Sequence, residues 1–191
     1  MYFNTIPEIT NEITKIISQS KMDFQDLEHH QLNWKPNADS WSVGQCLDHL
    51  VQSAKAYEPL FKDIINNNQS PNFWRSVPFL PSFFGKTILK AVGPVRDKKS
   101  KTFSVFEPTQ SNISTNILHE LDKQLMLFSS LATQLSDTPL KKVIVTSPVA
   151  KFVNYNLLDA LNIVTVHNYR HFNQAKEVMA MQEFPKEEAV G

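Results

Sequence analysis

The sequence predicts an all-α protein: a four-helix bundle with a long connection between its second and third helices. Three observations support this prediction. Four stretches repeat their apolar residues at helical spacing, and only 4 of the 191 residues are glycine. No series of strand patterns alternates with the helical stretches. Long helices that are each apolar on one side bury that side by packing into a bundle. We expect residues 1–191 to form a single domain around one hydrophobic core.

The first helix is expected from about Pro7 to Asn33. Pro7 suits the first turn, because the backbone N–H that proline lacks would have no partner there. The apolar side of this helix consists of Ile9, Ile13, Ile16, Ile17, Phe24 and Leu27.

The second helix is expected to begin near Ser42 and to end in the run Asn66–Asn68. Ser42 and Gln45 have the spacing of a capping box, in which each side chain accepts a hydrogen bond from the backbone N–H of the other residue. Pro59 lies within this stretch and predicts a kink or an earlier end. The apolar side consists of Val43, Leu47, Leu50, Ala54, Tyr57, Phe61 and Ile64.

The third helix is expected from about Ser111 to Leu135, and the fourth from about Asn156 to Met181. Asn156 followed by Asp159 is typical of a helix start, with a capping residue and an acid in the first turn. The apolar side of the third helix is Ile113, Ile117, Leu121, Leu125, Phe128 and Leu131 or Ala132. That of the fourth is Leu157, Leu161, Val164 and Val178, interrupted by His167 and His171.

Residues 69–108 form a connection well above the usual loop length. It is rich in aromatic and apolar residues and interrupted by prolines, and residues 83–92 within it are expected to form a short helix. Because exposing so much apolar surface is costly, we expect these residues to cover one end of the bundle. A flap over a binding site, or a surface for a partner protein, is the alternative. We expect the run Arg96–Lys101 to be a solvated turn, residues 143–145 a short extended piece, and residues 182–191 a polar, frayed tail.

The composition argues against several classes of protein. Nineteen basic and nineteen acidic residues cancel, so the chain lacks the overall positive charge that attracts nucleic acid. A single cysteine, Cys46, excludes an internal disulfide framework. No apolar run approaches the length of a membrane helix. The first residues lack the basic and then apolar pattern of a secretory signal, so we expect a cytoplasmic protein with no membrane partner.

Three of the six histidines lie where a solvated side chain is not expected. His167 and His171 are four residues apart, which places them on one face of a helix, and they continue its apolar side. His49 lies between Leu47 and Leu50 in the second helix. A buried imidazole without partners costs about 1–3 kcal/mol. A shared divalent cation would satisfy all three rings, because neutral imidazole binds Zn, Ni, Cu and Fe.

Taken singly, each of these histidines has a simpler interpretation as a core or surface residue. The spacing H-x-x-x-H alone is a weak indication of a metal site. Asn168 stands where a zinc peptidase of the H-E-x-x-H type would have glutamate, so that class is not supported.

Two segments resemble the DinB-like family of metal-binding four-helix proteins. They are WSVGQCLDHLVQS at residues 41–53 and LLDALNIVTVHNYRHFNQAKEV at residues 157–178. Residues 102–111 and 145–148 also resemble members with an extended connection, so the resemblance spans about residues 7–181. It implies a metal triad of His49, His167 and His171, with further coordination positions open. Arg170 and Gln174 match the family pattern as well. The resemblance implies no role for Arg170 beyond bundle stabilisation or an anion contact, and suggests Gln174 as a hydrogen-bond partner of a ligand.

The resemblance also implies a function. Characterised relatives include thiol S-transferases, and others are described as hydrolases, so we expect a metal-dependent enzyme of one of these two types. The expected metal is Zn or Ni, with Fe or Mn as alternatives. The expected substrate is a small molecule, such as a low-molecular-weight thiol, and the resemblance favours a homodimer. A non-enzymatic, stress-responsive metal-binding bundle and an interaction protein that acts through residues 69–108 remain alternatives.

The remaining candidate residues are expected to have structural roles. No catalytic residue or general base can be identified from the sequence. Cys46 lies three residues before His49 but is expected to be a small core residue rather than a ligand. Three further histidines, His29, His30 and His119, are expected at the surface. We expect Trp34 and Trp41 to hold the first tight connection against the end of the bundle.

Overall fold

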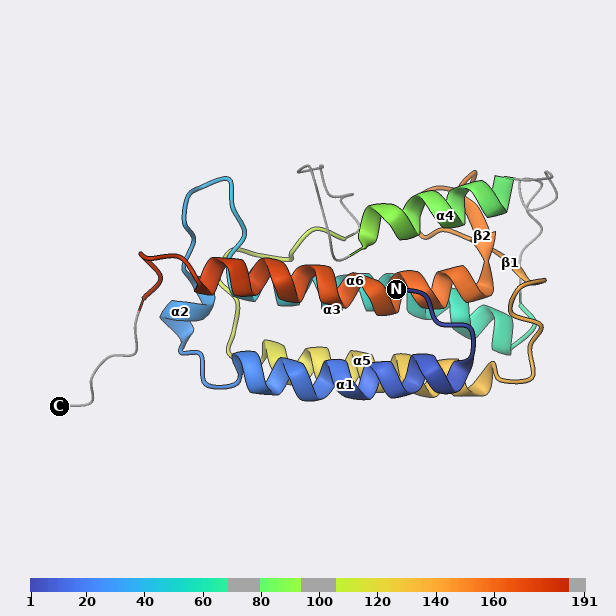
Figure 1. Ribbon diagram of the computed structural model, residues 1–191, viewed down its shortest axis with the longest axis horizontal. Helices are drawn as coiled ribbons and strands as arrows, with labels where there is room; N and C mark the ends of the chain where they lie inside the picture. The colour runs from blue at the N-terminus through green and yellow to red at the C-terminus, as the bar shows by residue number, and fades with distance from the viewer. Residues whose placement is uncertain (69–79, 94–105, 186–191) are drawn as a thin grey trace.

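The computed structural model describes residues 1–68, 80–93 and 106–185, and Figure 1 shows their arrangement. These residues form six helices and one two-stranded sheet, so the all-α fold class is confirmed. In chain order the elements are α1 (Ile6–Phe24), α2 (His29–Asn33), α3 (Val43–Ile65), α4 (Leu80–Val92), α5 (Ile117–Gln134), β1 (Ile144–Thr146), β2 (Asn154–Asn156) and α6 (Leu157–Met179).

The four long helices α1, α3, α5 and α6 run side by side and form the bundle (Figure 1). Helix α3 packs against α5 and α6, and α1 packs against the same two helices. The predicted apolar sides meet in the middle of the bundle, where burying one leucine or isoleucine contributes about 1.5–3 kcal/mol. The fully buried side chains from these helices include Ile9, Ile13, Ile16, Leu47, Leu121, Leu125 and Leu157.

The predicted caps of α3 and α6 are confirmed. The backbone N–H of Gln45 donates to the Ser42 hydroxyl at 3.1 Å, and the N–H of Ser42 donates to the Gln45 side chain at 3.3 Å. The Asn156 side chain accepts from the N–H of Asp159 at 2.8 Å. Pro59 does not end α3, which continues to Ile65. These caps fix where the two histidine-bearing helices begin.

The prediction of one helix from Pro7 to Asn33 was wrong, because α1 ends at Phe24 and a separate α2 follows. A new helix start explains the break. The N–H of Glu28 donates to the Gln31 side chain at 2.9 Å, and the N–H of Leu32 donates to the Glu28 carbonyl at the same distance. The turn between the two helices lets both Phe24 and Leu32 reach the core.

The third predicted helix begins at Ile117 rather than near Ser111. Residue 113 is bonded elsewhere: its N–H donates to the Asn33 side chain at 2.6 Å, and its carbonyl accepts from that side chain at 2.8 Å. Since Asn33 satisfies both backbone groups of Ile113, the segment before α5 is fastened to the end of α2 and does not join the helix.

The predicted short helix in the long connection is confirmed as α4, which begins at Leu80, three residues earlier than expected. Helix α4 packs against β2 and α6. Its Ile88, Leu89 and Val92 side chains are partly buried against the core, whereas Phe83 is 64% exposed. For these residues, the expectation that the connection folds back onto the bundle is confirmed. Phe73, Trp74, Phe79, the run 96–101 and residues 186–191 lie outside the described residues.

The extended piece expected at residues 143–145 is one strand of a two-stranded antiparallel sheet, whose second strand was not predicted. The sheet precedes α6 directly, and Val145 and Tyr155 bury their side chains at its centre. The paired residues are Ile144 and Asn156, Val145 and Tyr155, and Thr146 and Asn154.

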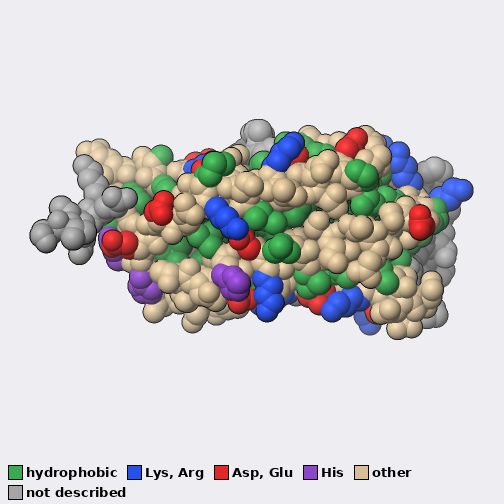
Figure 2. Space-filling view, turned by 90° about the horizontal axis from the view of Figure 1, so that it is seen from below, with side chains coloured by type: hydrophobic (Ala, Val, Ile, Leu, Met, Phe, Trp, Pro, Cys, Tyr) green, Lys and Arg blue, Asp and Glu red, His purple; other side chains and the backbone are tan. Residues whose placement is uncertain are grey.

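The surface carries both signs of charge. On the face shown in Figure 2, basic and acidic side chains are interspersed, with histidines toward one end. No helix in residues 1–68, 80–93 or 106–185 has the length and apolar character needed to cross a bilayer.

The packing of α4 yields a first prediction, on Gly85. A Cβ atom at this position would overlap with Asp159 Oδ2. Asp159 is held in place, because its carboxylate accepts from the Tyr2 hydroxyl at 2.9 Å and from the Asn156 amide at 2.7 Å. Gly85→Ala should therefore lower the free energy of unfolding by about 1–3 kcal/mol, measured by urea denaturation.

Gly93→Ala is the matched control at the end of the same helix. Its added Cβ would meet only the carbonyl oxygens of Leu89 and Lys90, both at 3.5 Å, and Gly93 does not have a positive φ. Equal stability of the two variants would show that α4 does not pack closely on α6.

Candidate metal centre

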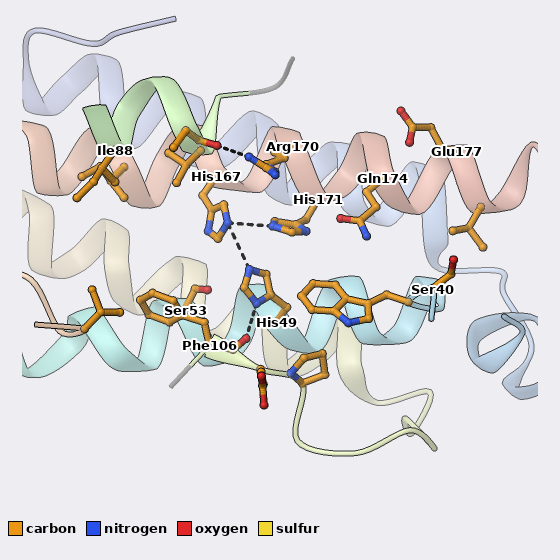
Figure 3. A pocket seen from close by; sticks show the side chains of 18 of the residues that line it. Ser40, His49, Ser53, Ile88, Phe106, His167, Arg170, His171, Gln174 and Glu177 are labelled. Carbon is orange, nitrogen blue, oxygen red and sulfur yellow. Dashed lines mark hydrogen bonds between the residues drawn. The ribbon is translucent and has the colours of Figure 1, made fainter. Parts of the chain in front are cut away.

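Helices α3 and α6 bring three histidine side chains together. His167 and His171 lie one turn apart on α6, and His49 faces them from α3 (Figure 3). His49 and His171 are buried, and His167 is half-buried. The predicted convergence of the three rings is confirmed, while their role as metal ligands stays a prediction.

The three Nε2 atoms have the spacing of metal donors. Nε2 of His167 lies 3.3 Å from Nε2 of His49 and 2.9 Å from Nε2 of His171. Each of the three rings offers one nitrogen donor, and these three atoms all lie within 4.8 Å of one another. Two nitrogens that bind one zinc ion at about 2.0–2.1 Å and a tetrahedral angle are about 3.3–3.4 Å apart. The 2.9 Å spacing corresponds to a smaller angle, of roughly 90° at the same bond length. The residues therefore fit a divalent cation.

The orientation of the His49 ring is fixed by a backbone group. Its Nδ1–H donates to the carbonyl of Phe106, which leaves the Nε2 lone pair facing the other two histidines. This contact has the form in which metal-binding histidines commonly use their second nitrogen. Nδ1 of His171 is buried, and hydrogen bonding from the Gln174 side chain partly opposes the lowering of the pKa of this ring. Gln174, on the next turn of α6, lies beside this ring (Figure 3).

Asp48 holds the segment that carries the Phe106 carbonyl. Its Oδ2 accepts from the backbone N–H of Thr109 at 2.6 Å and from the Thr109 hydroxyl at 2.9 Å. Gln45 adds a bond at 3.4 Å to the carbonyl of Gln110. Helix α3 thus fastens residues 106–110, and through them orients its own histidine. An acid next to His49 was the only feature of the sequence that pointed to this contact.

Burial keeps the three imidazoles neutral. Loss of hydration lowers the pKa of His49 to about 4, partly opposed by its bond to Phe106. Loss of hydration is also the largest cause that lowers the pKa of His167 and of His171, and the neighbouring histidines and Arg170 lower it further. Near pH 7 the rings therefore carry lone pairs that are available to a cation, with no bound proton to displace.

The histidines line a cavity of about 760 Å³. Trp41 forms one wall, with its ring 4.9 Å from that of His49 and 5.7 Å from that of His171. From the sequence, Trp41 was expected only to hold the first connection against the end of the bundle. Its position directly before the Ser42 cap, at the start of the helix that carries His49, was the available signal. Trp34 instead packs edge-on against Phe184, at 5.7 Å.

Helix α4 forms another wall of the cavity, through Ile88, Ala91 and Val92. Arg170 of α6 donates to the carbonyl of Ala91 and so joins the two helices beside His167 (Figure 3). Helix α4 therefore packs on the bundle and also forms a wall of the cavity, while a flap over a binding site stays a prediction.

The other candidate residues lie away from the centre, as predicted. Cys46 is fully buried in the core and does not belong to the histidine group. Burial raises the pKa of its thiol, which makes it unreactive. His29, His30 and His119 are exposed.

Comparison with known proteins agrees with this site. The family model of the DinB superfamily matches residues 24–175, a range that contains all three histidines. The chain is 24% identical to the uncharacterized protein YuaE of Bacillus subtilis (strain 168) over 157 residues, which cover 82% of this chain and 88% of YuaE. No solved protein structure matches the chain significantly.

Metal content gives the direct test of the site. Protein purified without a histidine tag should contain about one divalent ion per chain by elemental analysis. His49→Ala, His167→Ala and His171→Ala should each lose most of that metal, with folding verified by circular dichroism. His119→Ala, at the surface, should retain it. Full metal content in His167→Ala would remove the assignment.

Because Asp48 holds the segment that orients His49, we expect a change at Asp48 to weaken metal binding although Asp48 is not a ligand. Asp48→Ala should free the Phe106 segment, loosen the His49 ring and weaken zinc binding by about tenfold. Competition with a chromophoric chelator measures the affinity. Glu58→Ala, an acid on the same helix outside the cavity lining, is the control. Equal affinities of the two variants would contradict the orienting role.

Proposed function

Because the chain belongs to the DinB superfamily and three of its histidines converge at a cavity, we propose that it is a metal-dependent enzyme that joins a low-molecular-weight thiol to an electrophilic small molecule. The observation that carries this proposal is the placement of the three Nε2 atoms, which meet at the wall of a cavity of about 760 Å³. Three protein donors leave positions for a substrate, as in catalytic sites and unlike closed structural ones.

A divalent cation in this centre would lower the pKa of a thiol or of a water molecule, and so make it nucleophilic near neutral pH. The chain itself supplies position and environment. His49, His167 and His171 hold the ion as neutral donors. Trp41 and Phe106 line the cavity around them and restrict water. Arg170 ties α4 to α6 and keeps the cavity enclosed beside His167.

The surroundings of the histidines favour thiol transfer over hydrolysis. Among the described residues, no carboxylate joins the histidine group. The neighbouring acid, Asp48, is bonded to Thr109 and Gln52 and does not line the cavity. The carboxylates that do line it, Asp39, Glu107 and Glu177, stand outside the histidine group. Hydrolysis needs a base to accept a proton from water, whereas a thiol with a pKa of about 8.5 ionises far more readily. Since Cys46 is buried in the core, the reacting sulfur has to come from a substrate.

A non-enzymatic metal protein is the second candidate, and one observation favours it. The histidines come from two different helices, so an ion would join α3 to α6. A structural ion of this kind would make a large contribution to folding. Thermal unfolding with and without a chelator separates the two functions, because an enzyme whose bundle is already well packed should lose little stability.

The test of transferase activity uses several small thiols. Cysteine, glutathione and coenzyme A are each incubated with monochlorobimane, and the conjugates are quantified by liquid chromatography and mass spectrometry. We expect at least one thiol to react about tenfold or more above background with the metal-loaded protein. The rate should disappear with a chelator and in His167→Ala, and persist in His119→Ala. No metal-dependent rate with any thiol would reject transfer, and turnover of 4-nitrophenyl acetate instead would indicate a hydrolase.

A further inference from the structure

One hydroxyl group in the cavity has no partner. Ser53 lies on α3 one turn beyond His49 and one turn before Tyr57, so all three side chains share a helix face, and all three line the cavity. Ser53 is 6% exposed, and its Oγ forms no hydrogen bond with any residue in the described part of the chain.

Ser53 differs from Ser20 and Thr165, two other buried residues in helices whose hydroxyl groups have hydrogen-bond partners. Serine and threonine inside helices commonly donate to a carbonyl in the preceding turn. Ser20 does so to Ile17, and Thr165 does so to Leu161, each at 2.9 Å. Ser53 makes no such bond. A buried polar group without a partner is unfavourable, so this hydroxyl would gain a partner if its side chain turned toward a molecule bound in the cavity that Ser53 lines.

The cavity has two chemically different ends. Ser53 and Ile88 lie on one side of the histidines, and Ser40, Gln174 and Glu177 lie on the other (Figure 3). Two further lining residues extend this end: Tyr57, one turn beyond Ser53 on α3, and Ile163, one turn before His167 on α6. With Ile88, they make its walls mostly apolar.

The other hydroxyl of this α3 face is already engaged. Tyr57 Oη shares a hydrogen bond of 2.8 Å with Tyr155 Oη. A charged group would lose its hydration among these apolar walls, whereas an uncharged acceptor would lose little and gain the serine hydroxyl.

We propose that the Ser53 end of the cavity binds the apolar part of a substrate, and that Ser53 Oγ–H donates to an uncharged carbonyl oxygen on it. The occupant is therefore an apolar carbonyl compound rather than an ionic metabolite. Only the identification of this carbonyl compound as the electrophile of thiol transfer rests on the proposed function. Residues four apart on a helix are separated by about 6 Å along the axis, so a carbonyl bonded to Ser53 lies next to the histidine centre.

The test compares two probes that differ in one group, 2-acetylnaphthalene and 2-ethylnaphthalene. Dissociation constants are measured by protein NMR titration of the full-length protein as purified, and again after chelation. We expect the wild type to favour the acetyl compound. This preference is expressed as the dissociation constant of the ethyl compound divided by that of the acetyl compound. In Ser53→Ala, this ratio should fall by about fivefold to tenfold, the usual effect of one lost hydrogen bond.

The ratio distinguishes recognition from a structural effect, because a general loosening of the cavity would weaken both probes equally. Ser40→Ala, at the opposite end of the cavity, is the control and should leave the ratio unchanged. An unchanged ratio in Ser53→Ala, as expected if water alone occupies the hydroxyl, overturns the proposal. Failure of both probes to bind also overturns it.

The outcome is independent of the proposed transferase activity. The ratio needs neither bound metal nor turnover, so a protein that conjugates no thiol can still show the Ser53 effect. Conversely, if the protein conjugates thiols but Ser53→Ala leaves the ratio unchanged, the proposed transferase function stands and the proposed role of Ser53 is rejected.

Discussion

The burial of three imidazole rings between α3 and α6 is the constraint on which the site depends. Each ring gives up hydration, which lowers its pKa, and each must find partners inside the protein. The surrounding structure responds to that need. Trp41 packs on the rings of His49 and His171, and the carbonyl of Phe106 accepts a hydrogen bond from Nδ1 of His49. A hydrophobic core alone would not require these contacts, so they indicate a centre built for the histidines rather than histidines placed in a core.

The chain between α3 and α5 turns this pair of helices into an enclosed site. Its helix α4 packs on α6, where Gly85 allows the close approach to Asp159. The same helix supplies one wall of the cavity through Ile88, Ala91 and Val92. Its last residues, 106–110, cross α3 and are fastened there by Asp48 and Gln45. The connection that departs from a plain four-helix bundle therefore contributes directly to the candidate site, which explains why it is much longer than a loop needs to be.

The parts of this structure that the sequence predicted are those set by neighbours a few residues apart. Helical periodicity, the Ser42–Gln45 cap and the one-turn spacing of His167 and His171 are all local patterns. The parts it did not predict depend on residues far apart in sequence. Asn33 bonds to Ile113 and thereby delays α5, and Asp48 bonds to Thr109. Such pairs leave no periodic trace in one sequence, and the unpartnered Ser53 hydroxyl is visible only once its surroundings are known.

The hydrogen positions on the three rings give an independent argument for a cation. A neutral His49 that donates from Nδ1 to Phe106 has a lone pair on Nε2. His167 Nε2 lies 3.3 Å from that atom and 2.9 Å from His171 Nε2. If His167 donates to His49, it cannot also accept from His171. If it accepts from His171, two lone pairs face each other at His49. With two-centre hydrogen bonds no arrangement of protons satisfies all three contacts, whereas one cation accepts all three lone pairs at once. The geometry of the three rings therefore fits a shared divalent cation.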